Sequence, residues 1–181
     1  MLKDLRKYSG FTLIELMIAI SVISVLASIA VPAVLTWLPN YRLKAAARDL
    51  YSNMQKAKLE AVKRNTDAVI LFTPGVFSPG GYVGSYQIFA DNGSGGGTAN
   101  DGIRNGTEPI LTTIAMPKNV SLYLANFSAT ASTGYNSRGL PWNSRWGRVE
   151  LRNNNSRFYQ ITLSSAGSLR MRISSDGLTW N

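Results

Sequence analysis

The sequence predicts an α+β protein in which a long N-terminal helix packs on an antiparallel β-sheet domain. Three features lead to this prediction: an apolar run over residues 11–38, an amphipathic segment over residues 41–64, and short strand-like segments in the C-terminal two thirds. The chain has 181 residues, which suits one domain with appendages. We expect four parts: a leader (1–10), a membrane-spanning helix (11–38), its amphipathic continuation (39–66) and a β-rich domain (67–181).

The apolar run over residues 11–38 contains one charged side chain, that of Glu15. At ~1.5 Å per residue the run is long enough to cross a hydrocarbon layer of ~30 Å. Lys3, Arg6 and Lys7 precede it. Positive charge on the N-terminal flank places that end in the cytoplasm, so the rest of the chain is expected outside the inner membrane.

Two prolines lie in or next to the apolar run. Pro32 removes a backbone donor and crowds the preceding turn, so we expect it to kink the helix. Pro39, followed by Asn40, is a second helix breaker that either ends the membrane segment or bends it again.

A short motif opens the apolar run. Gly10 is followed by Phe11 and then by Thr-Leu-Ile-Glu, ending at Glu15. This stretch resembles the cleavage signal of type IV prepilins and type II secretion pseudopilins. The resemblance implies that a prepilin peptidase cuts between Gly10 and Phe11 and N-methylates Phe11. It also implies that Glu15 pairs with the Phe11 amine of a neighbouring subunit during filament assembly. The alternative is a membrane-edge glutamate that reaches the lipid headgroups.

The segment over residues 41–64 has the period of a helix with one buried face. Apolar residues recur at steps of three and four: Leu43, Ala47, Leu50, Met54, Ala57 and Ala61. The other faces carry the lysines and arginines of the segment, as on a solvated surface: Arg42, Lys44, Arg48, Lys56, Lys58, Lys63 and Arg64. Asn65, Thr66 and Asp67 are expected to end the helix.

Short segments of strand character follow, separated by Gly- and Asn-rich turns. The predicted strands are residues 68–72, 85–90, 109–115, 120–124, 148–151, 158–163 and 169–173. Spacing of this kind is typical of antiparallel β structure. The loop after Asp91 has oxygen ligands that would suit calcium, but it lacks the acids of an EF-hand, so we expect a hairpin loop there.

The order of the segments resembles the pilin branch named after the GspH pseudopilin and the FimT minor pilin, and it implies a pilin-like fold. The resemblance is carried by Asp91, Asn92, Glu108, Pro109, Ser137, Gly139, Ser165 and Gly167.

The residue inventory excludes several kinds of chemistry. The chain contains no cysteine and no histidine. A disulfide framework, a Ser-His-Asp triad and a Cys-His dyad are therefore impossible. We expect no metal site, no cofactor and no enzymatic activity, and we expect the chain to be itself a substrate of the peptidase.

The formal net charge is +9, and the excess is concentrated in arginines of the C-terminal third. Arg148, Arg157, Arg170 and Arg172 are candidate DNA contacts because guanidinium groups suit phosphates. Aromatic residues that could stack on bases lie between them: Tyr135, Trp142, Trp146, Phe158 and Tyr159.

DNA-binding pilins of the FimT type carry a Gly-Arg-x-Arg motif, from which this chain departs. Only Arg170 falls in register after Gly167. The alternative is a strand that exposes Arg170 and Arg172 and turns Leu169, Met171 and Ile173 to the core.

The sequence thus predicts a structural subunit, a minor pilin or pseudopilin of a type IV pilus or a type II secretion pseudopilus. Its expected partners are the prepilin peptidase, other pilins, inner-membrane lipid before assembly and, as an alternative function, DNA taken up in natural transformation. A single-pass envelope protein unrelated to pilins would not be cut at Gly10. Which filament system the subunit serves is left open.

Overall fold

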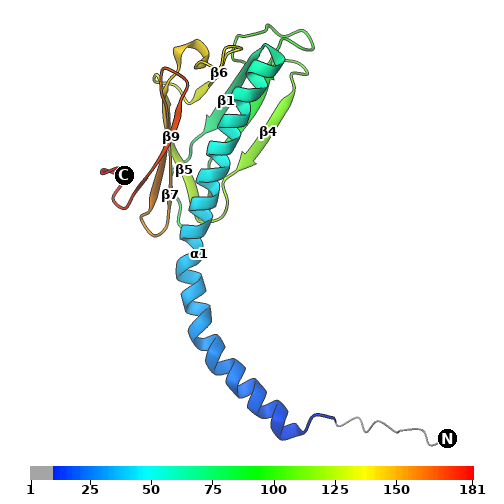
Figure 1. Ribbon diagram of the computed structural model, residues 1–181, viewed down its shortest axis with the longest axis vertical. Coiled ribbons are helices and arrows are strands. Elements are labelled where there is room, and N and C mark those ends of the chain that lie inside the picture. The colour runs from blue at the N-terminus through cyan, green and yellow to red at the C-terminus, as the bar shows by residue number, and fades with distance from the viewer. Residues whose placement is uncertain (1–9) are drawn as a thin grey trace, which may run out of the picture. The chain divides into compact units, whose positions relative to one another are not determined.

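The computed structural model describes residues 10–181 (Figure 1). Most of the predicted leader, including Lys3, Arg6 and Lys7, lies outside the described residues. The chain divides into two compact units, Met1–Leu38 and Pro39–Asn181.

One long helix is followed by nine strands in the described residues. The elements are α1 (Leu13–Arg64), β1 (Asp67–Thr73), β2 (Tyr82–Val83), β3 (Ser85–Asp91), β4 (Ile110–Ala115), β5 (Val120–Phe127), β6 (Ser132–Tyr135), a 3₁₀ turn η1 (Trp142–Ser144), β7 (Gly147–Asn153), β8 (Phe158–Leu163) and β9 (Leu169–Ser174).

Helix α1 has a defined cap at each end. Thr12 and Glu15 form a capping box at its start, because the Thr12 hydroxyl accepts the Glu15 N–H and the Glu15 carboxylate accepts the Thr12 N–H. At its end, Asn65 has a left-handed φ of 50°, and the N–H groups of Asn65 and Thr66 donate to the carbonyls of Val62 and Ala61. This is a Schellman ending, and it confirms the predicted stop.

The helix ends at neither proline. Pro32 and Pro39 both lie within the single helix Leu13–Arg64. The hydroxyls of Ser28 and Thr36 donate to the carbonyls of Val25 and Ala33, respectively. The helix therefore continues through Pro39, and the end of the membrane segment at residue 38 stays a prediction.

The N-terminal half of α1 is apolar on all sides. Its large hydrophobic side chains are exposed, and its most apolar window has a mean hydropathy of 2.5, so it is long and apolar enough to cross a membrane. The hydroxyls of Ser21 and Ser24 donate to the carbonyls of Met17 and Ile20. Both hydroxyls therefore have hydrogen-bond partners within the helix, which surrounding lipid tails would not supply.

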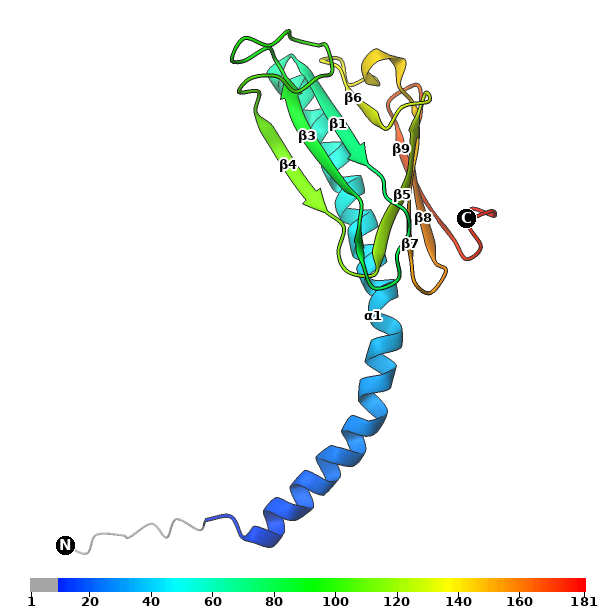
Figure 2. The same cartoon turned by 180° about the vertical axis from the view of Figure 1, so that it is seen from behind.

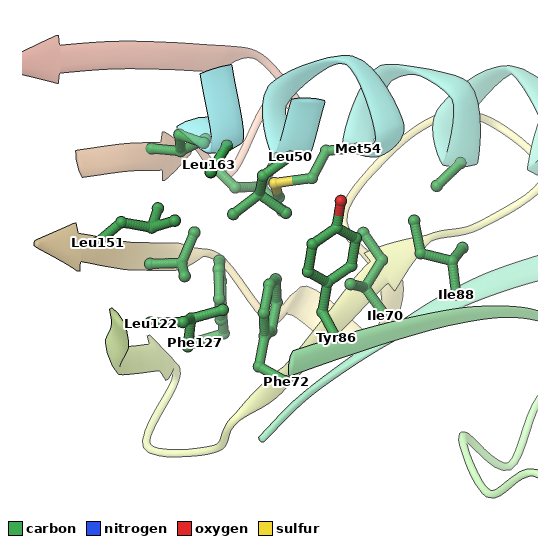
Figure 3. Packing of buried hydrophobic residues seen from close by; sticks show 14 of the residues in the cluster. Leu50, Met54, Ile70, Phe72, Tyr86, Ile88, Leu122, Phe127, Leu151 and Leu163 are labelled. Atoms are coloured by element: carbon green, nitrogen blue, oxygen red, sulfur yellow. The ribbon is translucent and has the colours of Figure 1, made fainter. Parts of the chain in front are cut away.

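The C-terminal half of α1 buries one face against the β domain. Every residue of the predicted stripe is buried, and Pro39 and Ala46 are buried with it. In Figure 3, Leu50 and Met54 from the helix point toward Ile70, Phe72 and Tyr86 from the strands. The Tyr86 hydroxyl accepts a hydrogen bond of 2.8 Å from the Asn53 amide. The amphipathic pattern of the sequence is thereby confirmed.

Two sheets form the β domain. The first has the order β4-β3-β1-β6 and is antiparallel throughout, and the second has the order β2-β5-β7-β8-β9 (Figure 2). In the second sheet β2 pairs parallel with β5, an exception to the predicted antiparallel arrangement. Phe72 at the end of β1 stacks on Phe127 at the end of β5, with ring centroids 5.3 Å apart, so the two sheets share one core.

All seven predicted strands are present, with ends shifted by a few residues. The sequence analysis missed β2, which has two residues, and β6, which has four. The expected fold class, a long helix packed on an antiparallel-rich β domain, is confirmed.

Candidate functional site

The segment that precedes α1 is open. Gly10 and Phe11 are outside the helix, and the Phe11 side chain is 89% exposed. A Cβ built on Gly10 would meet no atom within 4 Å. Within the described residues, packing therefore does not require glycine at position 10.

The Glu15 carboxylate has local partners. Its Oε2 atom accepts from the Thr12 N–H and from the Thr12 hydroxyl, each at 3.1 Å. A negative charge at the first turn also interacts favourably with the helix dipole. Thr12 is a residue that the sequence analysis overlooked, although the Thr-x-x-Glu spacing of a capping box was readable.

The loop between β3 and β4 is organised by two buried carboxylates. The Asp91 carboxylate accepts the N–H groups of Asn100 and Gly102 at 2.7 and 2.6 Å, and that of Glu108 accepts those of Gly93 and Asn105 at 2.8 and 2.9 Å. Burial raises the pKa of Asp91, whereas the two N–H bonds lower it. Among the described residues no group of three or more His, Cys, Asp or Glu side chains is placed to hold a metal.

Gly139 and Gly167, two of the residues that carry the family resemblance, lie close together beside Lys58 of α1. The Lys58 ammonium donates to the Gly167 carbonyl at 3.0 Å and lies 5.9 Å from the centre of the Tyr135 ring. A Cβ on Gly167 would lie 2.5 Å from the Gly139 carbonyl oxygen, and φ of Gly167 is +76°. The two glycines thus allow two loops to approach each other beside Lys58.

The outer face of β7, β8 and β9 carries a basic groove. The backbone register aligns Arg148, Thr162 and Arg170 in one row, and Arg172 lies opposite Gln160 in the next. A hollow of about 330 Å³ is lined by Arg148, Gln160, Thr162, Ser164, Ser168, Arg170 and Arg172. The structure therefore brings together three of the four arginines singled out from the sequence.

An exposed tryptophan extends the groove. A second hollow, of about 360 Å³, shares Arg148 and Thr162 with the first and is also lined by Trp146, Asn126 and Ser128. Trp146 is 55% exposed, enough for its ring to stack on a ligand. We call the two adjoining hollows the basic groove.

One acid lies under the basic groove. Glu150 is buried and accepts from the Arg148 Nε at 2.9 Å, from the Gln160 amide at 2.9 Å and from the Tyr123 hydroxyl. Burial, together with the bond to Glu150, raises the pKa of Tyr123. No ion pair of Arg170 or Arg172 occurs within residues 10–181, so both charges are available to an anion.

The structure does not bring all the residues singled out in this region together on the groove. Arg157 lies in the turn between β7 and β8 and does not line the basic groove. Tyr135 and Trp142 are buried, so neither can stack on a base. Met171 and Ile173 are 37% and 36% exposed, so β9 does not have a fully buried inner face.

Comparison with known proteins identifies the family. The family model of the type II transport protein GspH matches residues 46–167, and the prokaryotic N-terminal methylation motif matches residues 5–31. Because the first match covers more than half of the chain, the protein belongs to the GspH family. The resemblance seen in the sequence is thus confirmed.

A search of the curated proteins gave no match. Among solved structures, the crystal structure of the type IV minor pilin FimU from Pseudomonas aeruginosa is similar to this chain at 15% sequence identity and a TM-score of 0.49. The alignment covers 77% of this chain and 97% of that one.

Proposed function

We propose that this protein is a minor subunit of an envelope filament, either a type II secretion pseudopilus or a type IV pilus. The prepilin peptidase cuts after Gly10 and N-methylates Phe11. Residues 11–38 then hold the chain in the inner membrane, with the β domain outside the cytoplasm, until assembly moves the helix into the filament.

The observation that carries this proposal is a single helix whose first half is apolar and exposed and whose second half is buried on one face. Helix α1 begins within the methylation motif, remains apolar on all sides through its first half, and ends buried in a GspH-type domain. A secretory signal peptide would be removed with its apolar segment. Here the cut precedes the apolar segment, so the helix is retained as an anchor and as a packing surface.

Glu15 has a stated role in this proposal. A lone carboxylate in an apolar helix is costly unless it is paired. In the single chain Thr12 supplies the partners. In the filament the Phe11 amine of a neighbouring subunit replaces them with an opposite charge.

Processing tests the proposal directly. The chain is produced in cells that have an active prepilin peptidase and in cells whose peptidase is inactivated, and its N-terminal peptide is measured by mass spectrometry. We expect N-methylated Phe11 as the first residue in the former and the uncut chain in the latter. A mature chain beginning at another residue, or cutting that does not depend on the peptidase, would overturn the proposal.

A second candidate function, DNA binding, is favoured by the basic groove. Arg148, Arg170 and Arg172 surround one hollow, and Trp146 lines its extension. Guanidinium groups neutralise phosphates, and an exposed indole stacks on bases. This combination suits single-stranded DNA.

The matched test compares arginines inside and outside the groove. In a gel shift with single-stranded DNA and the full chain in detergent micelles, Arg170→Gln and Arg172→Gln should each weaken binding and lower the salt slope by about 1. Arg157→Gln, in the turn outside the groove, is the control and should have a smaller effect. Equal effects at all three positions would contradict a groove-specific site.

A further inference from the structure

Strands β4 and β9 each lie at one end of their sheet, and their open sides differ in how they are protected. Strand β9 carries Arg170 and Arg172, and its Ile173 exchanges two backbone hydrogen bonds, of 3.0 and 3.1 Å, with Asn181. Charge and a returning segment are devices that prevent a sheet edge from pairing with another chain. The open side of β9 is thus protected against pairing with another strand.

Strand β4, at the end of the first sheet, has neither device. Its sequence, Ile-Leu-Thr-Thr-Ile-Ala, contains no charge and no proline, and it pairs only with β3. Ile110 is 46% and Ile114 36% exposed. Figure 2 shows β4 at the outer side of the first sheet, beside β3. An uncharged edge of this kind can accept a further strand.

The backbone groups that would pair can be named. The Met116 N–H donates to the Gly84 carbonyl at 3.0 Å, toward the β2–β3 side. Because donor direction alternates along a strand, the Ile114 N–H faces β3, and those of Thr113 and Ala115 face outward. Two donors on the open side are therefore available for an added strand.

The flank of α1 next to β4 supplies charge. Two hollows, of about 270 and 310 Å³, separate the helix from the β4 region. On the helix side they are lined by Asn53, Lys56, Glu60 and Arg64, and by Arg42 and Asp49, respectively. Glu60 is already paired with Arg64 at 2.6 Å, which leaves Arg42 and Lys56 against Asp49.

We propose that β4 is a docking edge for an extended, acidic segment of a different filament subunit. That segment adds antiparallel to β4 as an extra strand. Its alternate side chains lie over Thr112 and Ile114 and direct a carboxylate toward Lys56. The net charge of +9 opposes self-pairing and attracts an acidic partner. This inference rests on the proposed assembly into a filament.

A proline at position 113 tests the backbone pairing. Thr113→Pro removes one outward donor, and Thr113→Val keeps it while changing the same side chain. Both are placed in the full chain in cells that assemble the filament, and the share of mature protein in the purified filament fraction is measured. We expect a loss of about threefold to tenfold for Thr113→Pro and none for Thr113→Val. Equal incorporation of both variants would overturn the proposal.

A cysteine at the same place keeps the test decisive if Thr113→Pro does not fold. The chain has no cysteine, so Thr113→Cys carries a unique thiol. We expect this thiol to react with a maleimide in cells lacking the peptidase and to be protected in filaments. Equal reactivity in both states would contradict docking at β4. A disulfide-linked dimer of the variant would identify a second copy as the occupant and so overturn the proposed partner.

The charge of the partner is tested separately. Lys56→Glu should lower incorporation, whereas Lys44→Glu, which is also exposed on the helix and lines neither hollow, should not. Equal effects would remove the acidic partner from the proposal. Cleavage at Gly10 is measured in every variant. If the unaltered chain is never cut or never enters filaments, it is the proposed function that fails, and that outcome is distinct from a β4 edge that stays open in assembled filaments.

Discussion

At the residue scale, Glu15 is satisfied before any partner arrives. Thr12 donates to the Glu15 carboxylate from both its backbone and its hydroxyl. The capping box therefore fixes the start of the helix and reduces the cost of a charge in an apolar segment. In the proposed filament, the amine of a neighbouring subunit would compete with these bonds, and its opposite charge would strengthen its own hydrogen bond to the carboxylate.

Two carboxylates meet where β1 pairs with β3. Asp67 lies opposite Asp91 in the register. Burial, and then the negative charge of Asp91, raise the pKa of Asp67, while a hydrogen bond from Trp142 lowers it. A raised folded-state pKa means that ionisation opposes folding, so stability is lost as the pH rises through the unfolded and then the folded pKa.

Asp67→Asn should therefore stabilise the protein at neutral pH, because it removes the charge while its side-chain oxygen can still accept from Trp142. We expect the unfolding temperature to rise by roughly 1–3 °C at pH 7 and the gain to vanish near pH 3. Thermal unfolding followed by circular dichroism between pH 3 and pH 7 measures this.

Asp176→Asn is the control of opposite sign. Bonds from the Ser174 hydroxyl and from the N–H groups of Leu178 and Thr179 hold the pKa of Asp176 well below its usual range. Its ionisation thus favours folding, and the asparagine should be less stable than the parent at pH 7. An Asp67→Asn variant that is less stable than the parent at every pH would contradict the account.

At the element scale, α1 was readable from the sequence because its pattern is periodic. The stripe from Leu43 to Ala61 repeats at helical spacing and is buried, and Asn65 ends the helix as expected. The effect of the prolines was less readable. Proline lowers the stability of a helix, but its neighbours decide whether the helix ends there.

The strands that were missed depend on contacts rather than on pattern. Strand β6 contains Gly134, where a Cβ would collide with the Ala68 carbonyl oxygen, so the close approach to β1 requires glycine. Strand β2 has only two residues and no alternation to detect. A contact between distant segments was also out of reach of the sequence: Arg152 of β7 stacks on Phe77 of the loop before β2, with its guanidinium carbon 3.9 Å from the ring centre.

The junction at Lys58 links the helix to the loops that carry Gly139 and Gly167. Lys58→Met keeps most of the side-chain volume and removes the bond to the Gly167 carbonyl. We expect a loss of about 1–2 kcal/mol in the free energy of unfolding, measured with urea. Lys56→Met, on the exposed side of the helix, should change it by less than about 0.5 kcal/mol. Equal losses in the two variants would show that the bond from Lys58 to the Gly167 carbonyl makes no specific contribution to stability.

At the scale of the whole molecule, the candidate sites differ in how far the sequence could define them. The processing motif is contiguous, so Gly10, Phe11 and Glu15 were found together. The basic groove is assembled across three strands, and only the register shows that Arg148 joins Arg170 while Arg157 does not. The open edge of β4 depends on sheet order, which no local pattern predicts.

The proposal that this chain is processed and then assembled is tested most directly in the filament itself. Filaments are purified from cells that produce the chain, and the N-terminal peptide of this subunit is measured by mass spectrometry, with Glu15→Ala as the matched variant. We predict a peptide that begins at N-methylated Phe11 in the filament fraction, and its loss from that fraction for Glu15→Ala although cutting continues. A parent chain that is cut and methylated yet stays in the membrane fraction and never enters filaments would contradict the account.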